Sequence, residues 1–408
     1  MASALDGIRV LDLTVWQQGT YASTMLADMG ADVIKIESPK QPDPGRGFLG
    51  SRVMNPYFET HNRGKRAIAL DLRHPRGKEA FLRLATNADV FLNNLRVGAV
   101  ERLGLDYEAV RAVNPRIIYA HACAYGRRGP DAHLGSFDLL AQARGGLMST
   151  IGDPAGPPMP VPIPIADQAG AFIAAYGIVL ALLHRERTGE GQEVETSLLG
   201  SQLALQSFNI AAFLQSGRLP QRQPRGAFGP LWNTYRCGDG RYISLAMLEQ
   251  RWWGEFCRAV GRPELEDDPD FATPQERGRH NERLTALLDE VFGQAPASEW
   301  LRRFGERGLI AAPVQNYEDV VNDPQVVANE YLEEVVDEGR GSMRMVGAPV
   351  RLGKTPPRIR GLAPGFGEHT REVLLENGFS EEEIRRLAEE GVILLGEGAA
   401  TTENVSES

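Results

Sequence analysis

Short apolar runs alternate with amphipathic segments over roughly the first 130 residues. Strands separated by helices predict βαβ units, and therefore an α/β fold with a Rossmann-like, mostly parallel sheet. Ligands bind such sheets at the carboxyl ends of the strands, so the residues that follow each run are the first candidates for a site. One helix is predicted to end at Gly30 and another to begin at Pro75. The predicted strands are Ile8–Thr14, Asp32–Glu37, Ala67–Leu72, Asp89–Asn94 and Ile117–Gly126.

The pattern changes in the second half of the chain. Residues 193–217 predict a strand that runs into a long helix, and Pro, Arg and Gly cluster over 217–230 as in a linker. A hairpin with Asp239 and Gly240 at its turn follows, and Ser380 with Glu383 forms a capping-box signature. The predicted organisation is a large domain of residues 1–224, a smaller α+β domain of 225–325, a return to the large domain over 326–395, and a disordered tail of 396–408.

A single charge, Asp167, lies at the start of a long apolar run that extends to Leu183. The fifteen uncharged residues from Ala169 to Leu183 are fewer than the roughly 20 that span a bilayer, so a helix buried in protein is predicted. Aspartate is a favoured N-cap residue, worth about 1 kcal/mol. The same position at a helix N-terminus keeps a carboxylate ionised at neutral pH, so Asp167 is predicted to be a cap, a nucleophile or both.

The charge is distributed unevenly along the chain. The net charge is −10, but residues 1–128 carry 18 Lys and Arg against 13 Asp and Glu, a net charge of +5. This balance argues against general nucleic-acid binding. It fits either a phosphorylated small molecule bound by the first third or a solvated basic face. Three widely spaced cysteines predict neither a disulfide framework nor a metal site, and the lack of a signal peptide predicts a cytoplasmic protein.

Several familiar kinds of active site are missing from the sequence. After the first predicted strand only Gly19 of a dinucleotide-binding G-x-G-x-x-G is present. The histidines are scattered, which argues against a metal centre, and no G-x-S-x-G motif is found. Carboxylates remain, and both Asp138 and Asp167 follow strands or begin helices. A carboxylate can take up an acyl group covalently.

The order and spacing of longer motifs resemble those of the class III CoA-transferases, such as formyl-CoA and carnitine CoA-transferases, with α-methylacyl-CoA racemase as a sister branch. The likeness covers nearly the full length. The segments that carry it are LDGIRVLDLT, LADMGADVIKIE, NRGKRAIALDLRHPRGKE, NPRIIYAHACAYGRRGP, FDLLAQARGGLMSTIGDPAGPP, IADQAGAFIAAYGIVLALLHRERTGEGQEVETSLL and VGAPVRL.

The resemblance implies an enzyme that moves coenzyme A from an acyl-CoA to a carboxylic acid through an aspartyl anhydride and an aspartyl-CoA intermediate. It implies Asp167 as the nucleophile, no metal, and an interlocked homodimer with no nucleic-acid or membrane partner. Phe137 and Asp138 are implied near the acyl group. The residues Trp16, Phe137 and Trp232 fit either an apolar or aromatic acyl pocket or ordinary core packing. The implied coenzyme A contacts are Gln17, Gln18, Leu70, Arg73, Asn94, Leu95, Arg96 and Arg102.

The chain also departs from the family pattern. Prolines precede Asp167 where the family has a glycine, and the usual N-F-R-P-G is here NLRVG. A segment near Gly226–Gly229 is the candidate for a closing loop. Two other functions stay open. A racemase needs two bases, and Phe137 stands where the racemase branch has a histidine. A coenzyme A-binding protein without catalysis is the second.

Overall fold

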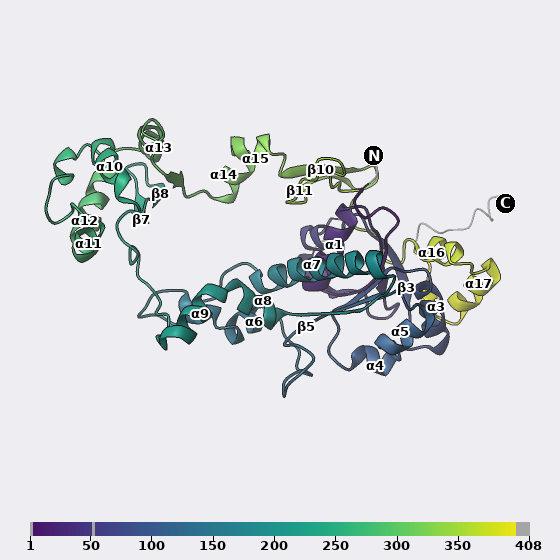
Figure 1. The fold of residues 1–408 in the computed structure, drawn as a ribbon. Helices are drawn as coiled ribbons and strands as arrows, with labels where there is room; N and C mark the ends of the chain where they lie inside the picture. The colour runs from purple at the N-terminus through teal and green to yellow at the C-terminus, as the bar shows by residue number, and fades with distance from the viewer. Residues whose placement is uncertain (1–2, 51–53, 397–408) are drawn as a thin grey trace. The chain divides into compact units, whose positions relative to one another are not determined.

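The computed structural model describes residues 3–50 and 54–396 of the chain. They form two compact units (Figure 1). The first unit draws on residues 1–149, 159–220 and 329–408, and the second on 150–158 and 221–328. Apart from its first residue, the predicted tail of 396–408 lies outside the described residues.

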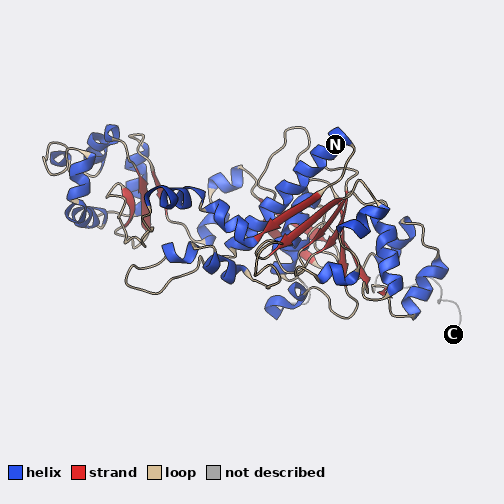
Figure 2. Ribbon diagram, turned by 60° about the horizontal axis from the view of Figure 1, so that its bottom comes forward, coloured by secondary structure: helices blue, strands red, loops and turns tan. Residues whose placement is uncertain are grey.

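A seven-stranded sheet forms the centre of the first unit, in the order β12-β3-β2-β1-β4-β5-β6. Every neighbouring pair is parallel except β12 with β3. Without the edge strand β12, this is the 3-2-1-4-5-6 order of Rossmann-like sheets, so the predicted mostly parallel α/β sheet is confirmed. Figure 2 shows the twisted strands with helices on both sides. The strands are β1 (Arg9–Leu13), β2 (Asp32–Glu37), β3 (Arg66–Leu70), β4 (Val90–Asn93), β5 (Ile118–Cys123), β6 (Glu193–Ser197) and β12 (Ile393–Leu394).

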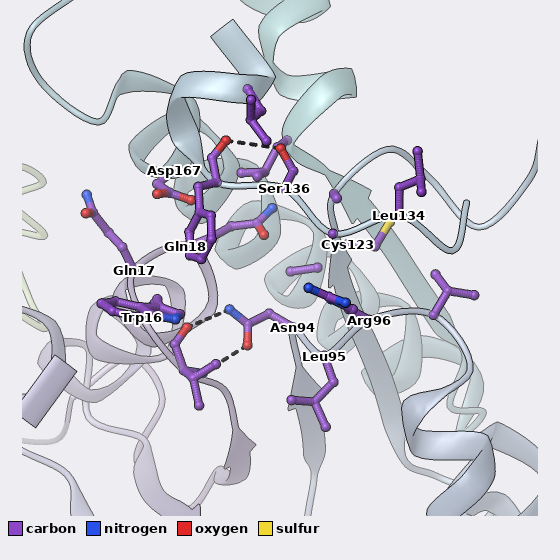
Figure 3. A pocket seen from close by; sticks show the side chains of 18 of the residues that line it. Trp16, Gln17, Gln18, Asn94, Leu95, Arg96, Cys123, Leu134, Ser136 and Asp167 are labelled. Atoms are coloured by element: carbon purple, nitrogen blue, oxygen red, sulfur yellow. Dashed lines mark hydrogen bonds between the residues drawn. The ribbon is translucent and has the colours of Figure 1, made fainter. Parts of the chain in front are cut away.

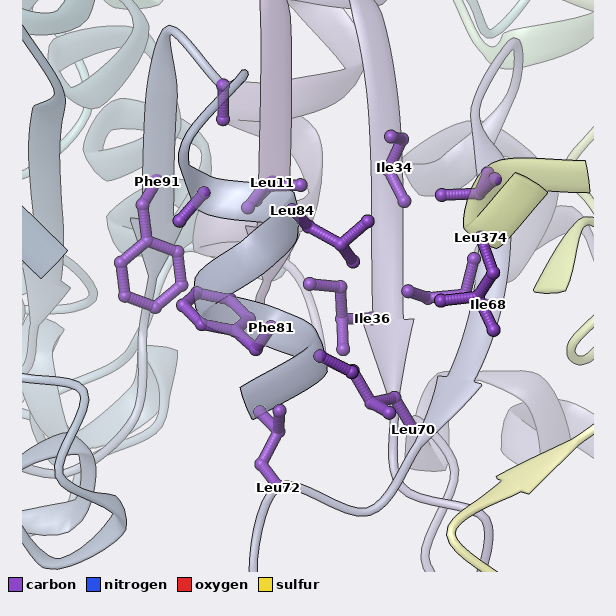
Figure 4. Packing of buried hydrophobic residues seen from close by; sticks show 14 of the residues in the cluster. Leu11, Ile34, Ile36, Ile68, Leu70, Leu72, Phe81, Leu84, Phe91 and Leu374 are labelled. Carbon is purple, nitrogen blue, oxygen red and sulfur yellow. The ribbon is translucent and has the colours of Figure 1, made fainter. Parts of the chain in front are cut away.

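Helices bury both faces of this sheet. Because successive strand residues point to opposite sides, neighbouring residues of β1 belong to different cores. Leu11 packs with Ile36, Phe91 and the helices on one face (Figure 4). Val10 belongs to the core of the other face. The first face is covered by α3 (Pro75–Ala85), α5 (Tyr107–Val113), α16 (Thr370–Glu376) and α17 (Glu381–Glu389), and the second by α1 (Gln18–Asp28) and α7 (Ile165–Thr188).

The sheet changes winding direction between β1 and β4, which are neighbours. The helix after β1 packs on one face, whereas α5, which follows β4 and the short α4 (Ala99–Leu103), packs on the other. In sheets of this kind a crevice opens at the carboxyl ends of the strands where the winding reverses. The fold therefore places the ends of β1 and β4 at its natural ligand site.

Helix α7 is longer than the sequence predicts, with 24 residues. By length and composition it could cross a membrane, but 44% of its most apolar window is buried. It buries Ala171, Ala174 and Ile178 in the core of the first unit. The predicted buried helix is therefore present, although the described residues of the first unit cover only one of its faces.

The predicted long helix after β6 is interrupted. It consists of α8 (Leu198–Leu205) and α9 (Ser207–Ser216), with Gln206 between them at φ −104° and ψ 15°. The Gln206 side-chain amide donates to the Gly145 carbonyl at 2.8 Å, a tertiary contact that helical periodicity cannot reveal. The predicted capping box of α17 is confirmed, since Ser380 and Glu383 make both of its hydrogen bonds. The unit is completed by α2 (Pro56–Asn62), α6 (Asp138–Arg144), β10 (Leu332–Asp337) and β11 (Gly341–Val346).

The second unit contains an antiparallel sheet with helices. Its hairpin turns at Asp239 and Gly240 as predicted, and Gly240 has φ +81°, which favours glycine. Residues 150–158 group with this unit, where Arg222 donates to the Asp153 carbonyl at 3.0 Å. The elements are β7 (Trp232–Arg236), β8 (Tyr242–Ala246), β9 (Ala311–Pro313), α10 (Trp253–Ala259), α11 (Pro274–Arg279), α12 (Asn281–Phe292), α13 (Ala297–Gly305), α14 (Tyr317–Asn322) and α15 (Pro324–Ala328).

Candidate active site

The loops that follow β1 and β4 are joined to each other at the switch point. The Val15 backbone N–H donates to the Asn94 side-chain oxygen at 2.9 Å, and the Asn94 amide donates back to the Val15 carbonyl at 2.8 Å (Figure 3). Gly19 permits this approach, because a Cβ there would come within 2.5 Å of Thr14 and 3.2 Å of Asn94. Gly19, the one residue of the dinucleotide-binding glycine pattern that is present, therefore allows the two loops to pack closely.

Trp16 adopts a left-handed backbone conformation with φ +63°. This region is unfavourable for a bulky residue and is found where the surroundings enforce it. The Trp16 backbone N–H donates to Asp43 at 3.1 Å, and Asp43 forms a fully buried ion pair with Lys35 at 2.8 Å. Thus a buried charge pair below the turn holds the conformation of Trp16.

A second buried ion pair lies in the same layer. Lys65 contacts Asp12 at 2.9 Å, and neither side chain is exposed. Burial raises the pKa of Asp12, but Lys65 and Lys35 outweigh it and hold that pKa below its usual value. Lys35 also donates to the Thr14 carbonyl at 2.9 Å. Two lysines and two aspartates thus tie β1 and its following turn to the neighbouring strands.

Two adjoining cavities open at the carboxyl ends of the strands. One of about 460 Å³ contains most of the predicted site residues, and one of about 170 Å³ contains Leu70 and Arg73. Val15 and Leu95 line both cavities, which makes them neighbours. The predicted residues that line the larger cavity are Trp16, Gln17, Gln18, Asn94, Leu95, Arg96, Phe137 and Asp167. Arg102 and Asp138 line neither of these two cavities.

Asp167 is not the N-cap of α7, so that prediction is wrong. The helix begins at Ile165, Pro164 occupies the cap position, and Asp167 is the third helical residue. The cap is supplied by Asp138, whose Oδ1 accepts from the backbone N–H groups of Ala166 at 2.6 Å and Asp167 at 3.1 Å. A capping group 29 residues away leaves no local signal in the sequence.

The carboxyl of Asp167 is partly buried beside this second carboxyl. Burial and then the charge of Asp138 raise the pKa of Asp167 from its usual 3.8 to about 7. This pKa differs from the prediction that the helix N-terminus keeps Asp167 ionised at neutral pH, because burial and the like charge of Asp138 disfavour the carboxylate. Asp167 exchanges its proton near neutrality, as acid–base and nucleophilic groups in active sites often do.

Gln17 and Gln18 present buried amide groups to the larger cavity. Each side chain is only 4% exposed, and within the described part of the chain neither side-chain NH₂ has a hydrogen-bond partner. Gly170 of α7 allows Gln18 its position, since a Cβ there would come within 2.8 Å of the Gln18 amide nitrogen. Buried amides without partners are costly, and they indicate a ligand that accepts hydrogen bonds.

The chain matches the sequence model of CoA-transferase family III over residues 5–370. The chain belongs to this family. This CoA-transferase is 34% identical to formyl-CoA:oxalate CoA-transferase of Streptomyces avermitilis, covering 96% of this chain and 100% of that protein. It is 37% identical to succinyl-CoA:mesaconate CoA-transferase of Haloarcula marismortui, covering 92% of this chain and 96% of that one.

A solved structure of a CAIB/BAIF family protein from Brucella suis is similar to this CoA-transferase, with a TM-score of 0.84 and 30% identity. The match covers 92% of this chain and 100% of that one. Recognition from motif order is therefore confirmed, and this chain is a CoA-transferase of family III. The non-catalytic alternative loses its support, because the relatives named above are named for transfer of coenzyme A.

Some residues at this site of the CoA-transferase were not anticipated from the sequence. Phe48 and Tyr57 pack with Trp16, with ring centroids 6.0 and 6.5 Å from it. Lys35 and Asp43 support Trp16 from below. None of these side chains belongs to a motif that follows a strand at the ligand edge, and Lys35 lies within β2 itself. Trp232, the third aromatic residue of the predicted acyl pocket, belongs to the second unit.

Proposed function

We propose that this enzyme transfers coenzyme A from an acyl-CoA thioester to a carboxylic acid by covalent catalysis on Asp167. The observation that carries the proposal is the position of Asp167 in the cavity at the switch point, next to the unpaired amides of Gln17 and Gln18. The family assignment supplies the coenzyme A substrate. The names of relatives supply the class of reaction, in which a carboxylate accepts coenzyme A.

In the proposed reaction the Asp167 carboxylate attacks the thioester carbonyl, the carbon–sulfur bond breaks, and coenzyme A leaves as its thiolate. The thiolate attacks the Asp167 carbonyl of the mixed anhydride, which releases the donor acid and leaves an aspartyl-CoA thioester. The acceptor carboxylate attacks that thioester and expels the thiolate. The thiolate then attacks the acceptor carbonyl, forms the new acyl-CoA and restores the carboxylate.

Each step passes through an oxyanion, and we assign its hydrogen-bond donors to Gln17 and Gln18. The N–H groups of Ala166 and Asp167 at the start of α7 are the local alternative, but both already donate to Asp138. The two glutamine amides have no partner within the described part of the chain. Donors held in place before charge develops stabilise it without reorganisation.

The direct test is to capture the acyl-enzyme. The protein is incubated with an acyl-CoA, treated with hydroxylamine and digested, and the peptide that contains Asp167 is weighed. An activated aspartyl group yields a hydroxamate on that peptide. Absence of the hydroxamate from every acyl-CoA that the enzyme turns over would contradict the covalent mechanism.

Acylation of Asp167 is expected to depend on pH, with a midpoint close to the pKa of about 7. Only the carboxylate attacks, so kcat/KM for the donor should rise with pH and level off above this pKa. Asp138→Asn retains an oxygen that can cap α7 but removes the neighbouring charge, so the midpoint should move to lower pH. Asp267→Asn changes an exposed carboxylate of the second unit and serves as the control. An unchanged midpoint in Asp138→Asn would exclude this coupling.

We propose that coenzyme A lies along the two adjoining cavities, with its phosphates near Arg73 and Arg96, which line them, and extends toward Arg102 on α4, which lines neither. The guanidinium groups of these arginines make no ion pair in the described part of the chain, so they are available to an anion. Alanine at each position should raise KM for the acyl-CoA several-fold, and the effect should shrink at high salt because exposed charges are screened. Lys354→Ala removes an exposed charge as the control. Unchanged KM values in all three variants would remove this site.

We propose that this CoA-transferase also self-associates through the uncovered side of α7 and α8. Five large apolar side chains recur at helical spacing on α7 and are 44–64% exposed. Apolar patches of this kind are typical of protein–protein interfaces. The α7 residues are Phe172, Tyr176, Val179, Leu180 and Leu183, and they continue into Leu203 and Leu205 of α8.

Sedimentation of the purified protein should therefore give the mass of a dimer. Tyr176→Glu places a charge on the exposed apolar face and should shift the equilibrium toward monomer. Tyr317→Glu, at a side chain that is 80% exposed on α14, should leave the mass unchanged. A wild-type monomer at micromolar concentration would contradict self-association. If the mass rises only when detergent is added, because detergent binds the apolar face, the result would indicate a lipid-facing surface instead.

A further inference from the structure

A cluster of four aromatic rings borders the active-site cavity, and two of them, Trp16 and Phe137, line it together with Asp167. Trp16 is its centre and makes edge contacts with Phe137, Phe48 and Tyr57 at centroid distances of 5.9, 6.0 and 6.5 Å. Phe48 and Tyr57 also contact each other at 4.8 Å. This packing leaves much of the outer rings accessible, since Phe137 is 61% exposed and Phe48 is 43% exposed. The cluster thus offers apolar ring surface to a ligand.

Phe137 is connected to Asp167 through one neighbouring residue and one hydrogen bond. Phe137 is the residue immediately before α6, and the next residue, Asp138, holds the backbone N–H of Asp167 at 3.1 Å. Both Phe137 and Asp167 line the larger cavity together with Trp16. An acyl group that reacts at Asp167 therefore meets the rings of Trp16 and Phe137.

The conformation of Trp16 is also determined by the fold. Its left-handed backbone is held by Asp43, which is 2% exposed and paired with Lys35. Strained backbone supported by a buried ion pair is typical of functional positions. The indole therefore has little freedom to withdraw from the cavity when an acyl group enters.

The charges around Asp167 disfavour a second carboxylate. Burial and Asp138 raise the pKa of Asp167, and no cation within the described residues offsets that shift. Among the described residues, Arg96 is the one cation that lines the larger cavity. In Figure 3 it lies on the side of Cys123 and Leu134, whereas Asp167 lies on the side of Gln17. A dicarboxylate would bring an unpaired negative charge to a place that already holds two carboxyl groups.

We propose that the acid exchanged on Asp167 is an aromatic monocarboxylate, with its ring packed against Trp16 and Phe137. This inference rests on the proposed function, because it concerns the acyl group of that same reaction. Edge-to-face contacts between rings give aromatic acids an advantage over alkyl acids of equal size. The selectivity thus differs from that in the names of the relatives, which contain oxalate and mesaconate.

The test measures exchange between an acyl-CoA and its own isotopically labelled acid, so that donor and acceptor carry the same acyl group. The probes are 3-phenylpropionate, its cyclohexyl analogue of nearly equal size, and succinate, each with its CoA ester. We expect exchange of the phenyl acid to exceed that of the cyclohexyl acid by about 3- to 10-fold, as ring–ring contacts predict. It should exceed that of succinate by about 100-fold, because the second carboxylate has no partner.

Two substitutions of Phe137 test separately the contact between rings and the lack of a counter-charge for a second carboxylate. Phe137→Leu should bring the phenyl-to-cyclohexyl ratio close to one, and Phe137→Arg should raise succinate exchange by about tenfold by supplying a counter-charge. Tyr317→Leu, on α14 of the second unit, should leave the ratio unchanged.

The outcomes distinguish this inference from the proposed function. Succinate exchange as fast as phenylpropionate exchange, or a phenyl-to-cyclohexyl ratio that survives Phe137→Leu, would overturn the aromatic site while leaving the transferase intact. Failure of all three acids to exchange, together with no hydroxamate on the Asp167 peptide, would overturn the proposed function and this inference with it.

Discussion

Replacement of Asp167 by asparagine is expected to lower CoA transfer at least about 1,000-fold, since an amide cannot attack a thioester to form the anhydride. The fold should survive. Asp167 does not cap α7, and the N–H groups at the start of that helix bond to Asp138. The measurement is the rate of acyl-CoA formation by the purified variant, with its mass confirmed to exclude conversion of Asn back to Asp.

The same substitution should change how stability depends on pH. The pKa of Asp167 is about 7 in the folded chain and 3.8 in its usual state. The folded protein therefore binds the proton more tightly, and the stabilisation from this group is complete below pH 3.8 and is lost as pH rises through 7. Asparagine carries no such proton, so the Tm of the variant relative to wild type should be higher at pH 8 than at pH 4.

Asp267→Asn, at an exposed position, is the matched control and should change neither transfer nor the pH dependence of Tm. Near-normal transfer by a verified Asp167→Asn protein would refute covalent catalysis and return Asp167 to a structural role. Loss of transfer accompanied by loss of the fold is the other unfavourable outcome. It would show that the side chain supports α7 in a way that the hydrogen bonds of Asp138 do not explain.

The second large effect is expected from Asp43→Ala, which should cost about 3–5 kcal/mol of unfolding free energy. It leaves Lys35 buried without its ion-pair partner at 2.8 Å. It also removes the acceptor of the Trp16 and Gly45 backbone N–H groups. Since the strained conformation of Trp16 depends on that acceptor, transfer activity should fall as well. Urea unfolding monitored by circular dichroism gives the free energy.

The control for Asp43→Ala is a surface pair. Glu382→Gln on α17 breaks contacts with the exposed Arg385 and Arg386, and such pairs add little to stability, so the urea midpoint should hardly change. If Asp43→Ala does not fold, Lys35→Met combined with Asp43→Leu should restore folding, because a buried pair can be replaced by apolar side chains. Activity should stay low in the double variant, since Trp16 still lacks its acceptor. An Asp43→Ala protein as stable and active as wild type would contradict the supporting role of the pair.

The sequence by itself determined the local elements and the family. The segments Asp32–Glu37 and Ile117–Gly126 predict strands, and β2 and β5 occupy those places. Pro75 and Ser380 mark helix starts because their chemistry acts within one turn. Family motifs, which occur along the chain in a fixed order, identified most of the predicted residues that line the two cavities, although Arg102 and Asp138 line neither.

Only the tertiary structure decided how these residues work together. Asp138 caps α7 from 29 residues away, Asp43 holds Trp16 from 27 residues away, and Lys35 is buried in β2, where it pairs with Asp43. The pKa of Asp167 follows from burial and from a neighbouring charge, neither of which is a property of adjacent residues. Secondary structure arises from short-range backbone preferences that a sequence displays directly. Electrostatics and ring packing depend on distances across the fold, and those distances exist only once the sheet has brought its loops together.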